Sequence, residues 1–349
     1  MIQRTQREQE RARVAFEEAA PPDLVRLAEA RARALPIAWT TEDIAEPSFL
    51  GSRVFDPISV SEIVPFIDWT PFFGVWELRG VYPRILNDPK VGASARELFE
   101  NGQALLDKIS SQALITAKAV YGFFAANSDG DDIIVYGDKS RKQELARFHT
   151  LRQQTRRVSE KPCLALADFV APLESGLVDF VGAFVVTTGH GVDEMVLEFE
   201  RDHDDYSAIM VKAIADRLAE ALAEKLHAQA RADCGLVDPD DFSIEDLIKG
   251  RYRSIRPAPG YPTQPDHTEK QTLFKLLQAK AAIGVSLTET FAMLPAASVS
   301  GLYFNHPEAR YFSLGKINRD QAADYASRKG MEIIEIERWL GPVLGYRPT

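Results

Sequence analysis

The sequence predicts an α+β fold with a mixed or antiparallel sheet and flanking helices. Strand candidates at 119–124 and 132–137 are separated by the turn residues of 127–130, which predicts a hairpin. The strand and helix candidates do not alternate strictly along the chain, as a doubly wound parallel fold would require. With 349 residues, 45% of them apolar, the chain is long enough to bury a core without disulfides or a structural metal.

The N-terminal third begins with polar helix signals and continues with large apolar side chains. Arg and Glu alternate through residues 1–34, which predicts a helix broken at Pro21 and Pro22, with Asp23 capping a second helix. We expect residues 1–47 to be a solvated arm or linker remnant and 48–349 to be one domain. Four aromatic residues crowd 64–73, and a helix is expected at 93–112.

The clearest helix in the sequence spans about 204–232. Ile214, Leu218, Leu222 and Leu226 recur every four residues, so they share one face of a helix. Strands are expected before it at 163–169 and 177–187, and a short helix after it at 244–250. The second strand candidate is rich in Val and Phe and largely uncharged, which is typical of a central strand.

The C-terminal part starts with a proline-rich loop at 251–268, which is either mobile or held for function. A helix at 269–282 and strands near 299–304 and 311–314 follow. Asn318 and Gln321 form a variant of the capping box that begins a helix ending at Gly330. A last helix is expected to end near residue 341.

Charge and composition exclude several classes of protein. A net charge of −10 argues against nucleic acid as the main partner, because duplex binding depends on clustered Lys and Arg. The N-terminus lacks the apolar core of a signal peptide. Only two cysteines occur, so we expect a reducing, cytoplasmic setting. The weakly charged stretch 281–304 contains Pro295 and Gly301, which favours a buried turn and strand over a membrane span.

Familiar catalytic and metal motifs are absent from the sequence. Neither a glycine-rich nucleotide loop nor an HExxH or GxSxG motif is present. The DxHxxG loop that binds cobalamin is also missing, and cysteine is too scarce for a zinc or iron–sulfur site. We therefore predict no metal ligands and no catalytic triad.

Four local patterns remain as candidate sites. Prolines at 257, 259 and 262, which follow Arg256, favour an extended backbone that can hold Arg256 and Tyr261 in fixed directions; Arg256 then binds a carboxylate or is simply solvated. Asp68, between Ile67 and Trp69, is either a helix cap or the partner of a ligand amine.

The other two patterns involve a helix and a strand. Glu220 lies on the polar face of the long helix, where it is solvated or faces a ligand. Tyr311 and Phe312 alternate on a strand candidate, so one ring could stack on a ligand or both could be core.

These segments together resemble one family, the C-terminal activation domain of cobalamin-dependent methionine synthase. The matching stretches run in order over roughly 60–346: IDWTPFF (67–73), ADFVAP (167–172), DDY (204–206), IMVKA (209–213), ADRLAE (215–220), IRPAPGYP (255–262), HTEK (267–270), LTE (287–289), 295–300 and 330–340. Matches spread over this length are far more specific than one short motif.

The resemblance implies a curved α+β domain that binds S-adenosylmethionine. In the family, such a domain repairs oxidised cobalamin with a methyl group from S-adenosylmethionine and an electron from a flavodoxin-like donor. Carried over by position, the ligand contacts fall on Asp68, Arg256 and Tyr311, with Phe312 beside them. Glu220 falls at another ligand-associated position, and Tyr261 lies in the stretch that approaches cobalamin.

Two positions and the size of the chain depart from the family pattern. Phe312 stands where a second tyrosine is expected, and Gly250 stands where an acidic residue is expected. The chain also lacks homocysteine, folate and cobalamin modules, so cobalamin must be bound by a partner. We therefore expect a separate subunit or an excised domain, inactive alone. The alternative is a non-catalytic module that binds S-adenosylmethionine or a corrinoid protein.

Overall fold

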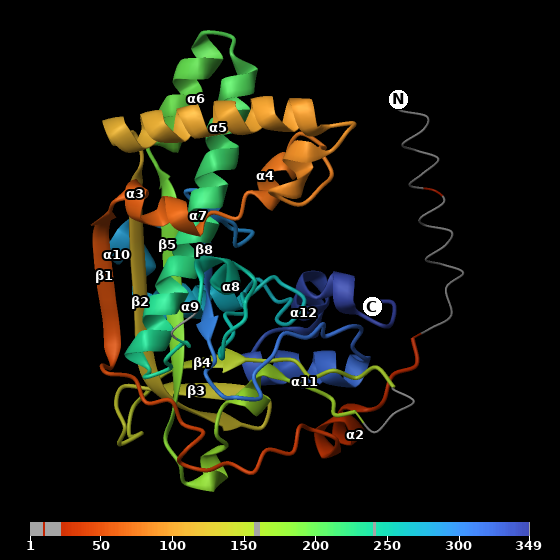
Figure 1. The fold of residues 1–349 in the computed structure, drawn as a ribbon. Coiled ribbons are helices and arrows are strands. Elements are labelled where there is room, and N and C mark those ends of the chain that lie inside the picture. The colour runs from red at the N-terminus through yellow and green to blue at the C-terminus, as the bar shows by residue number, and fades with distance from the viewer. Residues whose placement is uncertain (1–9, 11–21, 157–160, 240–241, 349) are drawn as a thin grey trace. The chain divides into compact units, whose positions relative to one another are not determined.

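The structure is a computed structural model that describes residues 10, 22–156, 161–239 and 242–348 (Figure 1). The chain forms two compact units. The larger comprises 37–150 and 166–312, and the smaller comprises 1–36, 151–165 and 313–349. Both units are discontinuous in sequence, which composition along the chain does not reveal. The predicted division at residue 47 stays a prediction.

An antiparallel sheet is the centre of the larger unit. Its order is β4-β3-β2-β5-β8, with β1 also pairing β2. The strands are β1 Gly51–Ile58, β2 Thr116–Asp129, β3 Asp132–Tyr136, β4 Glu144–His149, β5 Asp179–His190 and β8 Ser298–Tyr303; β6 Ser286–Leu287 and β7 Met293–Leu294 form a separate ribbon. The expected hairpin is the β2–β3 pair, and the predicted α+β class with an antiparallel sheet is confirmed.

Helices cover both faces of the central strands. Every residue of β5 from 179 to 189 is buried, which requires cover on each side of the sheet. The helices of this unit are α3 Val60–Ile63, α4 Thr70–Gly74, α5 Gly92–Gln112, α6 Val192–Arg201, α7 Asp205–Asp233, α8 Ile244–Ile248, α9 Glu269–Leu277 and α10 Ala279–Ile283; the short 3-10 helices are η1 Val64–Phe66, η2 Arg84–Asn87, η3 Leu166–Phe169 and η4 Leu173–Ser175.

Helix α7 forms where the four-residue repeat predicts it. The side chain of Asp204 accepts a hydrogen bond from the Ser207 backbone N–H at 2.9 Å, which caps the first turn. The repeating apolar face is buried, and the helix packs against β5 and β8. Figure 1 shows α7 running alongside these strands. Because the helix is anchored along its whole length, the direction of its remaining side chains is fixed as well.

Several expected elements differ in the structure. The segment 163–169 is not a strand: residues 163–165 are irregular and η3 follows. Residues 311–314 are also irregular, so strand alternation does not apply there. The helix expected at 269–282 is broken at Gln278, whose φ is +50°. Strands β1 and β4 and helix α6 were not predicted.

The smaller unit has its own core and a buried polar network. Helices α11 Arg319–Lys329 and α12 Ile333–Trp339 pack around Tyr325, with α2 Leu27–Ala32 and the 3-10 helix η5 Gly341–Val343 completing the unit. Asn318 caps α11 as predicted, but Gln321 does not complete a capping box because its amide pairs with the backbone of Arg152. Asp23 does not cap α2; the Leu27 N–H donates to Asp320 at 2.6 Å.

Two further sequence expectations concern the N-terminal residues and the stretch 281–304. The helix expected over the first 20 residues lies almost entirely outside the described residues. The weakly charged stretch 281–304 forms the end of α10, β6, β7 and all of β8. Within the described chain, no helix is both long enough and apolar enough to cross a membrane.

Candidate functional site

The proline-rich loop 251–268 is held against the sheet. Ile255 and Phe304 exchange backbone hydrogen bonds at 3.0 Å, and the Leu302 N–H donates to the Pro257 carbonyl at 3.0 Å. Residues 255 and 257 are therefore pinned to the end of β8. Arg256 lies between these two anchors, so its backbone position is fixed on both sides.

The side chain of Arg256 enters a buried cluster on α7. Its Nη2 pairs with Oε2 of Glu224, and its Nη1 lies 3.2 Å from Oε1 of the same carboxylate. Nη1 also donates to the Tyr252 hydroxyl at 2.6 Å and lies 3.2 Å from Nδ1 of His227. Tyr252 in turn donates to Glu224 at 3.0 Å. The structure thus brings together one predicted residue and three that were not predicted.

The charges of this cluster support one another. Burial disfavours the charged guanidinium, but Tyr252 and Glu224 outweigh that cost and raise the pKa of Arg256. Burial, followed by the positive charges of Arg256 and Arg231, lowers the pKa of His227 well below its ordinary value. The cluster therefore contains a permanent cation, a carboxylate and a neutral imidazole.

One edge of the guanidinium stays open. Glu224, Tyr252 and His227 all contact the Nη1–Nη2 side, and no described residue accepts a hydrogen bond from Nε or from the second Nη2 hydrogen. The side chain is 19% exposed. A planar carboxylate can accept two parallel hydrogen bonds from this Nε–Nη2 edge.

Two further predicted residues are Tyr311, which contacts the Arg256 backbone, and Glu220, which lies near Tyr311 and Tyr261. The Tyr311 hydroxyl accepts the backbone N–H of Arg256 at 2.9 Å, while 58% of Tyr311 stays exposed. Glu220 is one turn before Glu224 on α7, is half-buried, and has no hydrogen bond to a described residue. After desolvation, the Glu220 carboxylate helps raise the pKa of the Tyr261 hydroxyl, which indicates that both groups face the same region.

The other predicted residues are placed less tightly. Asp68 is exposed and accepts the Thr70 N–H at 2.9 Å, a capping contact at the start of α4; no described residue links its carboxylate to Arg256 by a hydrogen bond. Phe312 packs edge-on against Phe169, and its carbonyl accepts from Thr263 at 2.7 Å. Tyr261, at the tip of the loop, is 60% exposed.

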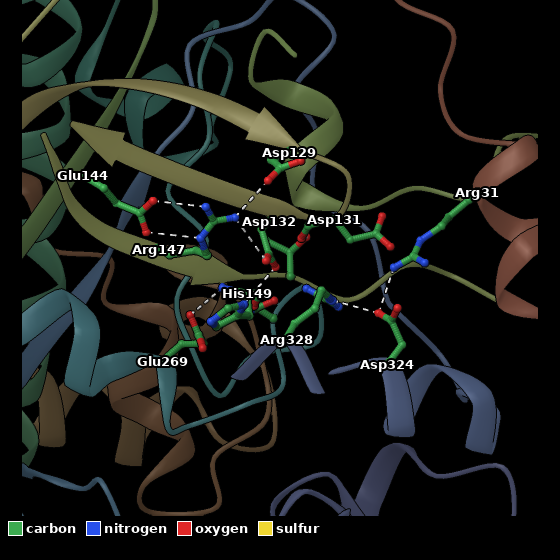
Figure 2. Close-up of polar contacts among 12 residues, drawn as sticks. Arg31, Asp129, Asp131, Asp132, Glu144, Arg147, His149, Glu269, Asp324 and Arg328 are labelled. Atoms are coloured by element: carbon green, nitrogen blue, oxygen red, sulfur yellow. Dashed lines mark hydrogen bonds and ion pairs between the residues drawn. The ribbon is translucent and has the colours of Figure 1, made fainter. Parts of the chain in front are cut away.

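A second polar cluster, in the larger unit, is closed by its own ion pairs. Figure 2 shows Arg147 between Glu144 and Asp129, which it contacts at 3.1 Å each, while His149 meets Asp132 at 2.9 Å. In the smaller unit, Arg31 and Arg328 share Asp324 at 2.8 Å each. These contacts join strands or helices, so they stabilise the fold.

The helix residues that sequence reasoning missed, Glu224, His227 and Arg231, follow the predicted Glu220 at a helical spacing. Glu220, Glu224, His227 and Arg231 follow one another at intervals of four, three and four, which places them on one face of α7. Glu224, His227 and Arg231 are all buried. A stripe of charged and polar residues at this spacing was a signal that the site extends along the helix.

Comparison with known proteins agrees with this picture. Residues 59–330, which contain every predicted site residue, match the family described as "Vitamin B12 dependent methionine synthase, activation domain". A solved structure, "Crystal Structure of the MetH Reactivation Domain bound to AdoHcy", is 46% identical with a TM-score of 0.90 and covers 94% of this chain and 100% of that one. The resemblance seen in the sequence is confirmed: the chain belongs to the family of vitamin B12-dependent methionine synthase activation domains.

Proposed function

We propose that this chain binds S-adenosylmethionine and presents its methyl group to cobalamin held by a partner protein or domain. The observation that carries the proposal is the open Nε–Nη2 edge of Arg256, which suits the carboxylate of the methionyl group. The similar MetH reactivation domain was solved with AdoHcy, the demethylated form of the same ligand.

Each predicted residue has a role that its position supports. Arg256 holds the carboxylate, and either Glu220, whose carboxylate has no hydrogen bond to a described residue, or Asp68 neutralises the ligand's ammonium. The exposed ring of Tyr311 packs against the ligand, and the backbone beside Phe312 borders it. Exposed Tyr261, at the loop tip, approaches the partner's cobalamin.

The protein contributes to the methyl transfer by positioning the ligand. S-adenosylmethionine supplies a methyl group on a sulfonium, and the partner's cobalamin accepts it. This chain's residues orient the ligand and exclude water from it, so no side chain acts as a nucleophile. A flavodoxin-like protein is proposed as the electron donor. Buried, unpaired Cys163 and Cys234 support a reducing, cytoplasmic setting.

Reconstitution in trans tests the proposal. The chain is mixed with a cobalamin-loaded methionine synthase that lacks its own activation domain, with a reductant and S-adenosylmethionine, and the visible absorption of the corrin is followed. We expect the Co(II) spectrum to disappear only when the chain, reductant and S-adenosylmethionine are all present. Arg256→Ala should slow the disappearance of the Co(II) spectrum.

Arg251→Ala is the matched control for Arg256→Ala. Arg251 lies five residues earlier, is largely exposed and pairs with Asp246, so its loss should leave reactivation intact. If the wild-type chain binds AdoHcy by calorimetry but the Co(II) spectrum persists with a cognate partner, the non-catalytic binding module is the better description.

A further inference from the structure

His227 contacts Arg256 in only one protonation state. Nδ1 of His227 lies 3.2 Å from Nη1 of Arg256 and 3.2 Å from the Tyr252 hydroxyl. Arginine can only donate hydrogen bonds, so Nδ1 is the acceptor in the tautomer that pairs with Arg256. The ring proton is therefore on Nε2, which donates to Oγ of Ser254 at 2.9 Å. A protonated ring would point an N–H at the guanidinium, and the lowered pKa of His227 keeps the ring neutral.

The plane of the His227 ring is fixed by aromatic neighbours. Tyr303 stacks on it with centroids 4.8 Å apart and 10° between the planes, and Phe184 stacks on the far side of Tyr303 at 4.7 Å. Tyr252 meets the ring edge-on at 5.0 Å. Because His227 is fully buried among these rings, Nδ1 has one direction in which to accept.

Ser254 is a strained residue at the other end of the ring. Its φ is +107°, a region that favours glycine, yet the position carries a side chain and is buried. Strain of this kind persists where the surroundings hold it, and it often marks a functional constraint. The hydroxyl that a glycine would lack is the group that orients His227.

We propose that His227 is a positioning residue that holds the guanidinium of Arg256 with its open edge towards the ligand's carboxylate. Ser254 sets the tautomer, the aromatic stack sets the plane, and Nδ1 sets the direction of Nη1. Glu224 neutralises the charge, but its flexible side chain could move together with a rotated guanidinium. Nδ1 belongs to a rigid ring and could not move in this way. This inference rests on the proposed function, because it names S-adenosylmethionine or AdoHcy as the source of the carboxylate.

Two ligands that differ only in the carboxylate separate positioning from packing. Calorimetry compares AdoHcy with its decarboxylated analogue, which keeps the amine, sulfur and nucleoside. For the wild-type chain we expect AdoHcy to bind roughly tenfold or more tighter, since only AdoHcy can pair with Arg256. If the wild-type chain does not distinguish the ligands, the role of Arg256 in the proposed function fails, and this inference with it.

Variants of His227 then test the inference itself. His227→Phe keeps a ring in the stack but removes both nitrogens, so we expect it to lose most of the preference for AdoHcy, roughly fivefold to tenfold, while binding the analogue as before. His227→Asn places an amide oxygen close to the position of Nδ1 and should restore much of the preference. If the wild-type chain distinguishes the two ligands, either of two results for His227→Phe would overturn the proposal. One is an equal loss of affinity for both ligands, and the other is an unchanged preference for AdoHcy.

Two further variants provide a second test of the role of His227 and a control. Ser254→Ala removes only the acceptor of the Nε2 proton, and a loss confined to AdoHcy is expected even if His227→Phe fails to fold. An unchanged preference in Ser254→Ala would contradict the role given to the tautomer. Gln229→Ala, exposed on the same helix, should change neither affinity.

Discussion

Replacing Gly260 with alanine should destabilise the larger unit by two separate mechanisms. The φ of Gly260 is +97°, so any side chain there is strained, at a cost of about 1–3 kcal/mol. An added Cβ would also lie 2.3 Å from Cε1 and 2.5 Å from Nδ1 of His267. Relieving such overlap costs about 1–3 kcal/mol more, so the total is about 2–6 kcal/mol.

Neither side of this overlap moves freely. The Gly260 N–H donates to the Gln264 carbonyl at 2.7 Å, which fixes the loop backbone. The His267 ring lies 3.0 Å from Nζ of Lys270, itself a buried side chain that also donates to the Phe291 carbonyl. Relief by a small shift of the loop or the ring is therefore expensive, and the loop that carries Tyr261 should be displaced.

Gly250→Ala is the matched control for this experiment. Gly250 also has a positive φ, +65°, but nothing lies within 4 Å of its added Cβ, so only the backbone strain of about 1–2 kcal/mol is expected. Urea denaturation can be followed by tryptophan fluorescence, because Trp39, Trp69 and Trp76 all lie in the larger unit. If Gly260→Ala destabilises the chain no more than Gly250→Ala, the argument from overlap with His267 is refuted.

Three other changes have defined outcomes. Arg256→Ala should weaken AdoHcy binding roughly tenfold or more, and unchanged affinity by calorimetry would remove Arg256 from the site. Tyr311→Ala should also weaken binding whereas Phe312→Tyr should be tolerated; equal losses would indicate packing only. Burial raises the pKa of Asp179 from 3.8 to about 6, so its contribution to stability is present below about pH 4 and is lost as pH rises through 6. The stability of Asp179→Asn relative to wild type should therefore increase by up to about 3 kcal/mol from pH 4 to 7, and a flat difference in urea denaturation would contradict this assignment.

The elements predicted correctly are those whose burial is visible as a sequence pattern. The four-residue repeat of Leu218 and its neighbours identifies α7, and the apolar run at 177–187 identifies β5. Strand β1 escaped prediction because residues 52–57 are exposed on both faces, so its side chains do not alternate between apolar and polar. The apolar run 163–169 was wrongly predicted to be a strand, because its apolar side chains are buried although its backbone pairs with no strand.

The site was predicted only in part, for a related reason. Arg256 stands out because a proline-rich run follows it, and the family pattern selects Tyr311. Glu224 and His227 look like ordinary polar positions on a helix, and their burial depends on β8 and on a loop about 30 residues away. Which helical carboxylate meets the guanidinium depends on how the helix packs against the sheet, and no local propensity contains that information.

Strand β1 has a consequence for how the protein behaves in concentrated solution. It pairs with β2 along one side only, and Val54 and Phe55 are 49% and 39% exposed. An edge strand with exposed apolar side chains is a template on which other chains can aggregate. Here Asp56 carries charge, and Pro57 offers no N–H to an incoming strand. Together with Arg53, these residues supply the charge and the proline that protect an edge strand from pairing with another chain.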